Sequence, residues 1–250
     1  MCWKKKPIAN VKRHGLLFAC NNYPGSQNDL NGCINDQNDV IAKFTPLGFT
    51  FDKFKDSEVT KSNFRNTIKN YVLGMTSGDI LLIHYSGHGS QVWDKEGDEP
   101  DGYDETLYLY DGNFTDDEFN EVLSLIPEGA KVIIALDSCH SGTATKDLRR
   151  GRFMPPEEMP KKKLNRRKKL GSSSEMNWNV FSGCRDNQTS ADAYIDGRYN
   201  GAFTWAWLKS FSPEMTYKEW LNATVYALYK AKYEQVPTLE GSFVDEKVFS

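Results

Sequence analysis

Two short blocks rich in glycine and polar residues hold side chains suited to nucleophilic chemistry. The first, residues 85–90, contains His88, and the second, residues 137–142, contains Cys139. A nucleophilic cysteine needs a base within hydrogen-bond reach, and histidine is the commonest one. An isolated cysteine or histidine is more often a packed structural residue. This pair is favoured as catalytic because each residue follows a predicted strand and the two stand roughly 50 residues apart.

The other histidines near these blocks suit the role of base less well. His84 lies inside an apolar run and is interpreted as structural. His140 is adjacent to Cys139, and adjacent strand-end side chains point apart. Glycines beside His88 let the chain turn sharply and bring backbone N–H groups close to a substrate carbonyl. The N–H groups of Gly89 and Cys139 could together form an oxyanion hole.

The two blocks must be positioned by strands of a parallel sheet. Residues 79–85 (DILLIHY) and 131–137 (KVIIALD) are nearly continuous apolar runs, as expected of central strands buried on both faces. Further strands are predicted at 16–20, 51–55, 179–182 and near 243–248, and helices at 35–44, 60–72, 115–125, 202–211 and 216–232. Thr115 and Glu118 are predicted to form a capping box. Alternating strands and helices predict a doubly wound α/β sheet, with functional groups at the carboxyl ends of the strands.

Charge is distributed unevenly along the 250 residues, although the formal net charge is only −3. Residues 94–121 hold twelve acidic residues and one basic residue, while residues 146–169 hold eleven basic and three acidic residues. Blocks of this kind usually mark solvated loops or interaction segments. Residues 146–175 are predicted to form a mobile, exposed basic linker. The linker would separate a larger catalytic region, residues 1–145, from a smaller region, residues 176–250, that completes the same domain.

The composition argues against several classes of protein. The five cysteines are scattered and form no C-x-x-C pair, which argues against a disulfide framework or a zinc site and for a reducing, cytoplasmic compartment. No apolar run reaches about 18 residues, so no membrane span is predicted. The basic start of the chain is not followed by the apolar stretch of a signal peptide. The basic run at 161–169 lacks interleaved aromatic residues, which disfavours a nucleic-acid partner.

Six blocks of the sequence resemble those of metacaspases, the caspase-like peptidases of plants, fungi, protists and bacteria. They are GCIND (32–36), HYSGHGSQ (84–91), DGYDETLY (101–108), DSCHSG (137–142), SGCRDNQTSADA (182–193) and GAFT (201–204). The resemblance implies a caspase-like three-layer sandwich, with a mostly parallel central sheet and helices on both faces. It places the family's catalytic pair on His88 and Cys139, with no third member evident. The chain resembles the bare catalytic core of a type I or prokaryotic member.

The resemblance also implies a pocket for a basic substrate side chain. The pocket falls on Asp36 and Asp137, and Cys33 and Ser86 line it. Asp137 stands two residues before Cys139, so in a strand both side chains point the same way. Two carboxylates in a cleft attract lysine or arginine, and arginine can bind them bidentately. The alternative for Asp36 is a charge that interacts with the N-terminal dipole of a helix.

Metacaspases often bind calcium beside the active site, and the matching residues here are Asp104, Asp116 and Asp117. Calcium takes six to eight oxygen ligands, mostly carboxylates, carbonyls and water. Three carboxylates from two loops would supply part of such a set. The alternative is a solvated acidic face, in which Asp116 and Asp117 charge the N-terminus of a helix.

These features predict a cysteine endopeptidase that cuts protein or peptide substrates after lysine or arginine. The resemblance further implies a calcium-stimulated monomer. Because the basic linker is tethered to its own active site, self-cleavage is predicted within residues 146–169, with the two fragments held together by the shared sheet. The alternatives are a caspase-like scaffold without turnover and a nucleic-acid binder that acts through residues 161–169.

Overall fold

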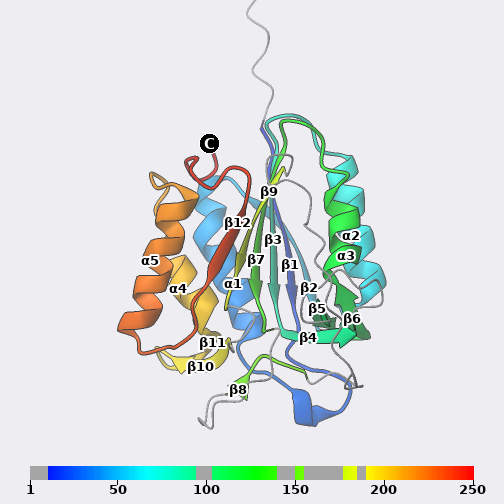
Figure 1. Cartoon of the computed structure of the whole chain (residues 1–250), viewed down its shortest axis with the longest axis vertical. Coiled ribbons are helices and arrows are strands. Elements are labelled where there is room, and N and C mark those ends of the chain that lie inside the picture. Colours follow the sequence, from blue (N-terminus) through cyan, green and yellow to red (C-terminus); the bar gives the residue numbers. More distant parts are fainter. Residues whose placement is uncertain (1–10, 94–102, 140–149, 155–176, 185–189) are drawn as a thin grey trace, which may run out of the picture.

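A six-stranded, mostly parallel sheet forms the centre of the molecule (Figure 1). The computed structural model describes residues 11–93, 103–139, 150–154, 177–184 and 190–250. In spatial order the strands are β12 (Thr238–Gly241), β9 (Trp178–Ser182), β7 (Lys131–Asp137), β3 (Ile80–Ser86), β1 (Arg13–Ala19) and β2 (Thr50–Lys55). Neighbouring strands are parallel except β12, which runs antiparallel to β9. The predicted central strands at 79–85 and 131–137 are confirmed as β3 and β7, and the structure shows that they are neighbours in the sheet.

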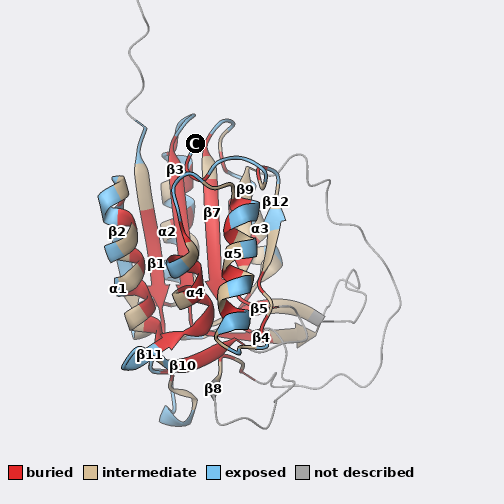
Figure 2. Ribbon diagram, turned by 90° about the vertical axis from the view of Figure 1, so that its left-hand side faces the viewer, coloured by how far each residue is buried: buried red, intermediate tan, exposed pale blue. Residues whose placement is uncertain are grey.

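Helices cover both faces of this sheet, which confirms the predicted three-layer α/β architecture (Figure 1). One layer consists of α1 (Cys33–Phe44), α4 (Ala202–Ser210) and α5 (Tyr217–Lys230), and the other of α2 (Lys61–Leu73) and α3 (Asp116–Leu123). Leu16 and Phe18 pack under α2 and α3, whereas Leu17 packs on the opposite side. Successive strand residues point to opposite faces, so a strand covered on both sides is apolar throughout. Figure 2 shows the resulting burial of β1, β3 and β7.

Threonine side chains begin three of the helices. Thr60, Thr115 and Thr216 each accept a hydrogen bond from the backbone N–H three residues further on. Such caps satisfy N–H groups that have no partner inside the helix. The capping box of Thr115 and Glu118 is confirmed, although its helix ends at Leu123, two residues earlier than predicted.

Two small sheets at the carboxyl ends of the parallel strands were not predicted from the sequence (Figure 1). The first contains β4 (His88–Trp93), β5 (Tyr103–Leu109) and β6 (Gly112–Thr115), and the second β8 (Arg150–Gly151), β10 (Ala191–Ile195) and β11 (Arg198–Gly201). The acidic stretch 94–121 is therefore not all solvated loop. Leu107, Leu109 and Phe114 point into the core beneath α2 and α3, so alternating apolar residues build strands among the charges.

The predicted strand near residues 243–248 is wrong. The last strand lies earlier, at Thr238–Gly241, and pairs with β9. Residues beyond it turn and bring Phe243, Val248 and Phe249 into the core beside α1, α4 and α5. These apolar residues do not alternate along a strand, and they close the core of the helical layer instead.

Residues 150–154 depart from the prediction of an exposed basic linker. Gly151 pairs with β10, and Arg152 and Met154 are buried. The rest of the predicted linker lies outside the described residues. An arginine is almost never fully buried unless paired, so Arg152 must be compensated by charges of opposite sign. Among the helices of the described ranges, none is long and apolar enough to cross a membrane.

Candidate active site

His88 and Cys139 follow two adjacent strands. Each lies two residues beyond the last residue of its strand, and these two last residues are partners in the sheet. Ser86 of β3 and Asp137 of β7 are partners in the parallel register. Both catalytic candidates therefore lie at the same carboxyl edge, and both are buried, with Cys139 at 0% and His88 at 5% exposure. The Cys139 thiol lies against Ser190, donating to its carbonyl oxygen at 3.4 Å and accepting from its backbone N–H.

The hydrogen bonds of His88 define which ring nitrogen can act as the base. Its Nε2 lies 2.7 Å from the carbonyl oxygen of Asn28, in the short 3-10 helix Ser26–Asn28. A carbonyl can only accept, so Nε2 carries the hydrogen and Nδ1 of the neutral ring keeps its lone pair. Nδ1 is buried and finds no partner among the described residues. The group that orients the base is thus a backbone carbonyl, which no side-chain pattern in the sequence could reveal.

Tyr23 supports the same imidazole. Its hydroxyl accepts the backbone N–H of His88 at 2.8 Å, and its ring packs against the imidazole at 4.8 Å between centroids. Burial lowers the pKa of His88, which favours the neutral ring at neutral pH. A neutral imidazole is the form that can accept a proton from a thiol.

Two backbone N–H groups converge on one carbonyl oxygen beside the thiol. Gly89 and Cys139 donate to the carbonyl oxygen of Arg152 at 2.9 and 3.1 Å. These are the two residues suggested by the sequence as an oxyanion hole, and the donor distances suit that role. Gly89 cannot carry a side chain here, because a Cβ atom would clash with the carbonyl oxygen of Cys139.

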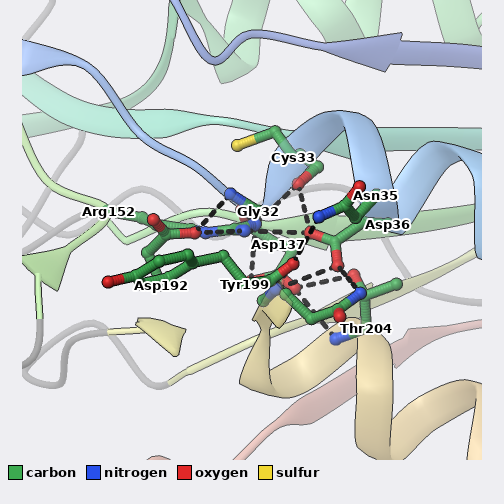
Figure 3. Close-up of polar contacts among 12 residues, drawn as sticks. Gly32, Cys33, Asn35, Asp36, Asp137, Arg152, Asp192, Tyr199 and Thr204 are labelled. Carbon is green, nitrogen blue, oxygen red and sulfur yellow. Dashed lines mark hydrogen bonds and ion pairs between the residues drawn. The ribbon is translucent and has the colours of Figure 1, made fainter. Parts of the chain in front are cut away.

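The guanidinium of Arg152 is enclosed by three buried carboxylates (Figure 3). Its nitrogens lie 2.9 Å from Asp36, 3.1 Å from Asp192 and 3.3 Å from Asp137, and every one of these side chains is 0% exposed. The hydroxyl of Ser86 lies 2.6 Å from Nη1. Charge-assisted contacts of this kind are what allow an arginine to leave water.

Each carboxylate is held by further donors, which fixes the shape of the pocket. The donors are Asn200 and Gly201 for Asp36, Ser190 and Thr204 for Asp137, and the N–H groups of Asn31 and Gly32 for Asp192, at 2.6–3.1 Å. Desolvated carboxylates are stable only when such bonds replace water. Burial, opposed by Arg152 and reinforced by Asp137, raises the pKa of Asp36 to about 6.

The structure brings the predicted pocket residues together and adds one. Asp36, Ser86 and Asp137 contact the same guanidinium. Cys33 begins α1 beside them and is fully buried. Asp192 was missed by the sequence reasoning, although it lies in the block 182–193 on which the family resemblance rests. Nothing in the sequence showed that β10 would bring its carboxylate to the pocket.

A family model described as the caspase domain matches residues 12–249. The chain belongs to the caspase domain family. Metacaspase-1 of Meyerozyma guilliermondii is 32% identical over 292 residues, which cover 92% of this chain and 70% of that relative. Metacaspase-1 of Mycosarcoma maydis is 30% identical, with the same two coverages.

Solved structures agree with this membership. A crystal structure of a protein from Geobacter sulfurreducens superposes with a TM-score of 0.74 at 28% identity, covering 96% of this chain and 98% of that one. Caspase-1 from Spodoptera frugiperda, at 14% identity and a TM-score of 0.65, covers 96% and 90% and shares the fold. The chain is a caspase-like cysteine-type peptidase related to metacaspases.

The acidic residues predicted to bind calcium lie apart from the buried pocket of this caspase domain. Asp104 is in β5, and Asp116 and Asp117 form the first turn of α3. Across the described ranges, no three His, Cys, Asp or Glu side chains form a group that could hold a metal ion. Residues 94–102 lie outside those ranges.

His84 has the structural role expected of it. It is fully buried, its Nε2 lies 3.1 Å from the hydroxyl of Thr204, and burial lowers its pKa to about 4. His140, the other histidine beside the nucleophile, lies outside the described residues.

Proposed function

We propose that this peptidase is an endopeptidase that cleaves after arginine and, less efficiently, after lysine. The observation that carries the proposal is the enclosure of the Arg152 guanidinium by Asp36, Asp137 and Asp192 while its carbonyl oxygen accepts from Gly89 and Cys139. A residue bound in this way presents its side chain to a specificity pocket and its carbonyl to the nucleophile.

The chemistry follows from the groups around Cys139. Nδ1 of His88 takes the thiol proton, and the sulfur attacks the carbonyl carbon of the substrate. The developing oxyanion accepts hydrogen bonds from the N–H groups of Gly89 and Cys139. His88 then gives its proton to the leaving amine as the C–N bond breaks. Water, activated by the same imidazole, hydrolyses the thioester and restores the thiol.

The geometry supports arginine over lysine. The two terminal nitrogens of the guanidinium reach three carboxylates and the Ser86 hydroxyl at once. A lysine ammonium has one nitrogen and cannot span these acceptors in the same way. A substrate with aspartate at this position would bring a fourth carboxylate into a buried acidic pocket.

Matched peptides test this proposal. We expect kcat/KM to fall from arginine to lysine, and to fall further for citrulline, which keeps the shape of arginine without its charge. All cleavage should be lost in Cys139→Ala, which removes only the attacking sulfur. Equal cleavage after citrulline and arginine would contradict the role of the carboxylates, and preferred cleavage after aspartate would overturn the proposal.

We propose separately that calcium stimulates the peptidase through the acidic residues Asp104, Asp116 and Asp117. Although these carboxylates do not form a ready metal site among the described residues, the pairing of Thr106 with Thr115 places Asp104 and Asp116 toward the same end of the β5–β6 hairpin, which supports the proposal. Replacing Asp116 and Asp117 by asparagine should then shift the calcium response to higher concentrations. Full activity in excess chelator would exclude a role for calcium. The acidic residues would then form only a solvated acidic face.

A further inference from the structure

A glutamine from the last part of the chain reaches the residue that contacts the nucleophile. Gln235 lies between α5 and β12 and is only 5% exposed. Its Nε2 lies 2.9 Å from the carbonyl oxygen of Gly183 and 3.1 Å from the hydroxyl of Ser190. Its Oε1 lies 3.0 Å from the backbone nitrogen of Ala191. Each polar atom of this buried amide therefore has a partner, as a desolvated amide requires.

The partners of this amide fix which way it faces. The carbonyl of Gly183 can only accept a hydrogen bond, and the backbone N–H of Ala191 can only donate one. The nitrogen of the Gln235 side chain must therefore face Gly183, and its oxygen must face Ala191. A glutamate or an apolar side chain of the same length could not make the same three contacts. The chemistry of this position is therefore specific to glutamine.

Ser190 accepts a hydrogen bond from the amide and donates its own hydrogen to the pocket. Its hydroxyl lies 2.7 Å from Oδ1 of Asp137, and an ionised carboxylate can only accept. Because a hydroxyl has a single hydrogen, that hydrogen points to Asp137 and a lone pair faces the amide of Gln235. The amide therefore holds the hydroxyl in the orientation in which it stabilises the carboxylate.

The backbone of Ser190 contacts the nucleophile and the residue in the pocket. Its N–H donates to the thiol of Cys139, and its carbonyl accepts from that thiol at 3.4 Å. The same carbonyl accepts the backbone N–H of Arg152 at 3.0 Å. Reacting groups must be held to within about 0.5 Å of their productive positions. A shift of Ser190 would therefore disturb the thiol, the backbone of the bound arginine and the pocket together.

Gln235 joins this part of the site to the central sheet. Gly183 directly follows β9, and its N–H donates to the carbonyl of Leu136 in β7 at 2.9 Å. Ala191 is the first residue of β10. One amide therefore ties the start of β10 to the end of β9, across residues 185–189, which lie outside the described residues. The central sheet supplies the fixed reference against which the amide holds the site.

We propose that Gln235 is a positioning residue for the peptidase reaction, because its amide holds Ser190 in place against Cys139 and Asp137. The amide touches neither the attacking sulfur nor the carboxylate, so it acts through Ser190. The inference rests on the proposed chemistry at Cys139 and not on the preference for arginine. Its test therefore uses the peptide that a library cleavage profile ranks first.

Steady-state kinetics of Gln235→Met test the inference, since methionine keeps the length of the side chain and removes the amide. We expect kcat/KM to fall more than about tenfold, as a small misplacement of reacting groups can cause. Gln37→Met is the matched control. Gln37 is also fully buried, and its amide donates to the carbonyls of Leu17 and Phe54 in β1 and β2. Both variants should unfold at lower temperature, but the control should keep kcat/KM within about twofold of the native value.

A double-mutant cycle separates positioning from a general loss of stability. Ser190→Ala removes the hydroxyl and keeps the backbone contacts to the thiol, while Thr204 still donates to Asp137, so activity should remain measurable. If the amide acts through Ser190, Gln235→Met should cost at least about threefold less in this background than in the native chain. Equal losses in the two backgrounds would mean that the amide acts by another route, which overturns the inference.

A second substitution gives the test in a different side chain. Gln235→Glu keeps an acceptor for the Ala191 N–H but offers no donor when ionised, so we expect a loss of kcat/KM like that of Gln235→Met. Native kcat/KM in either variant overturns the inference, as does an equal loss in Gln37→Met. If Cys139→Ala is inactive, such a result leaves the proposed function standing. If Cys139→Ala stays active, the proposed chemistry fails and the inference fails with it.

Discussion

At the scale of single residues, the proposed specificity depends on carboxylates that are buried away from solvent. Asp36, Asp137 and Asp192 are fully buried, and each receives hydrogen bonds from neighbouring groups. Replacing one partner of a buried pair leaves the other charge uncompensated. Activity on basic substrates is therefore expected to be sensitive both to single substitutions and to the protonation of these residues.

Asp192→Asn tests the carboxylate that the sequence reasoning missed. The substitution keeps the shape of the side chain but removes its charge. It should therefore lower kcat/KM for an arginine peptide by a factor that corresponds to about 2–5 kcal/mol. Asp196→Asn is the matched control, because Asp196 is exposed on the turn after β10 and its φ of 51° suits asparagine. A similar loss in both variants would mean that general damage to the hairpin, and not the pocket charge, is responsible.

The pKa of Asp36 predicts a dependence of substrate binding on pH. Burial raises this pKa to about 6 even though Arg152 opposes the shift, so Asp36 is expected to titrate well above the range of an ordinary aspartate. As pH falls through the pKa of Asp36, its carboxylate gains a proton and the pocket loses a negative charge. We therefore expect KM for an arginine peptide to rise on acidification.

Two comparisons isolate this effect from the titration of His88. Asp36→Asn should remove the rise in KM, since asparagine cannot titrate. Alkylation of Cys139 by iodoacetamide does not require a basic side chain to bind in the pocket. The pH dependence of its rate should therefore reflect only His88 and Cys139. A KM that stays flat between about pH 5 and 7 would exclude Asp36 as the titrating group.

At the scale of elements, the turn from β11 into α4 shapes the floor of the pocket. Gly201 donates its N–H to Asp36, and Thr204 of the same turn donates to Asp137 at 2.6 and 2.8 Å. A Cβ atom on Gly201 would clash with the carboxylate of Asp137 and approach Arg152 Nη1 at 2.7 Å. The glycine is needed here for space, because its φ is −69° and places no demand on conformation.

Gly201→Ala should therefore weaken arginine binding while leaving the fold largely intact. Overpacking of this kind costs about 1–3 kcal/mol, and here the displaced atoms belong to the pocket. Gly74→Ala after α2 is the control, because its added Cβ atom would come no closer than 3.5 Å to other atoms. Circular dichroism should be unchanged in both variants. Wild-type kcat/KM in Gly201→Ala would contradict the packing argument.

The sequence predicted the elements that have a strong period and missed those that depend on distant partners. Apolar runs, with the capping box of Thr115 and Glu118 for one helix, located the central strands and the helices within a few residues, because local chemistry decides them. The strands β8, β10 and β11 are only 2, 5 and 4 residues long and form by pairing with one another. For the same reason Asp192, the Asn28 carbonyl and buried Arg152 could not be assigned from the sequence.

At the scale of the whole molecule, a cut within residues 146–169 of the predicted linker would divide one sheet between two fragments. Strand β9 from the second fragment pairs along its length with β7 from the first. Phe44 of α1 contacts Trp207 and Trp220 of the other fragment within a shared core. Burial of this apolar surface should hold the fragments together after cleavage.

Size-exclusion chromatography of the cut protein checks this expectation. The two fragments should elute together at the size of the intact chain and separate only in denaturant. Cys139→Ala, which remains uncut, provides the reference elution volume. Fragments that separate in native buffer would mean that the interface across β7 and β9 is not sufficient to hold them together.

The central claim is that the buried acidic pocket directs Cys139 to bonds after arginine. A cleavage profile across a peptide library, varied at the residue before the cut bond, measures this most directly. The account predicts arginine first, lysine second and little cleavage after any other residue. It also predicts that this order weakens in Asp192→Asn and persists in Asp196→Asn. A native profile led by aspartate or by uncharged residues would contradict the account.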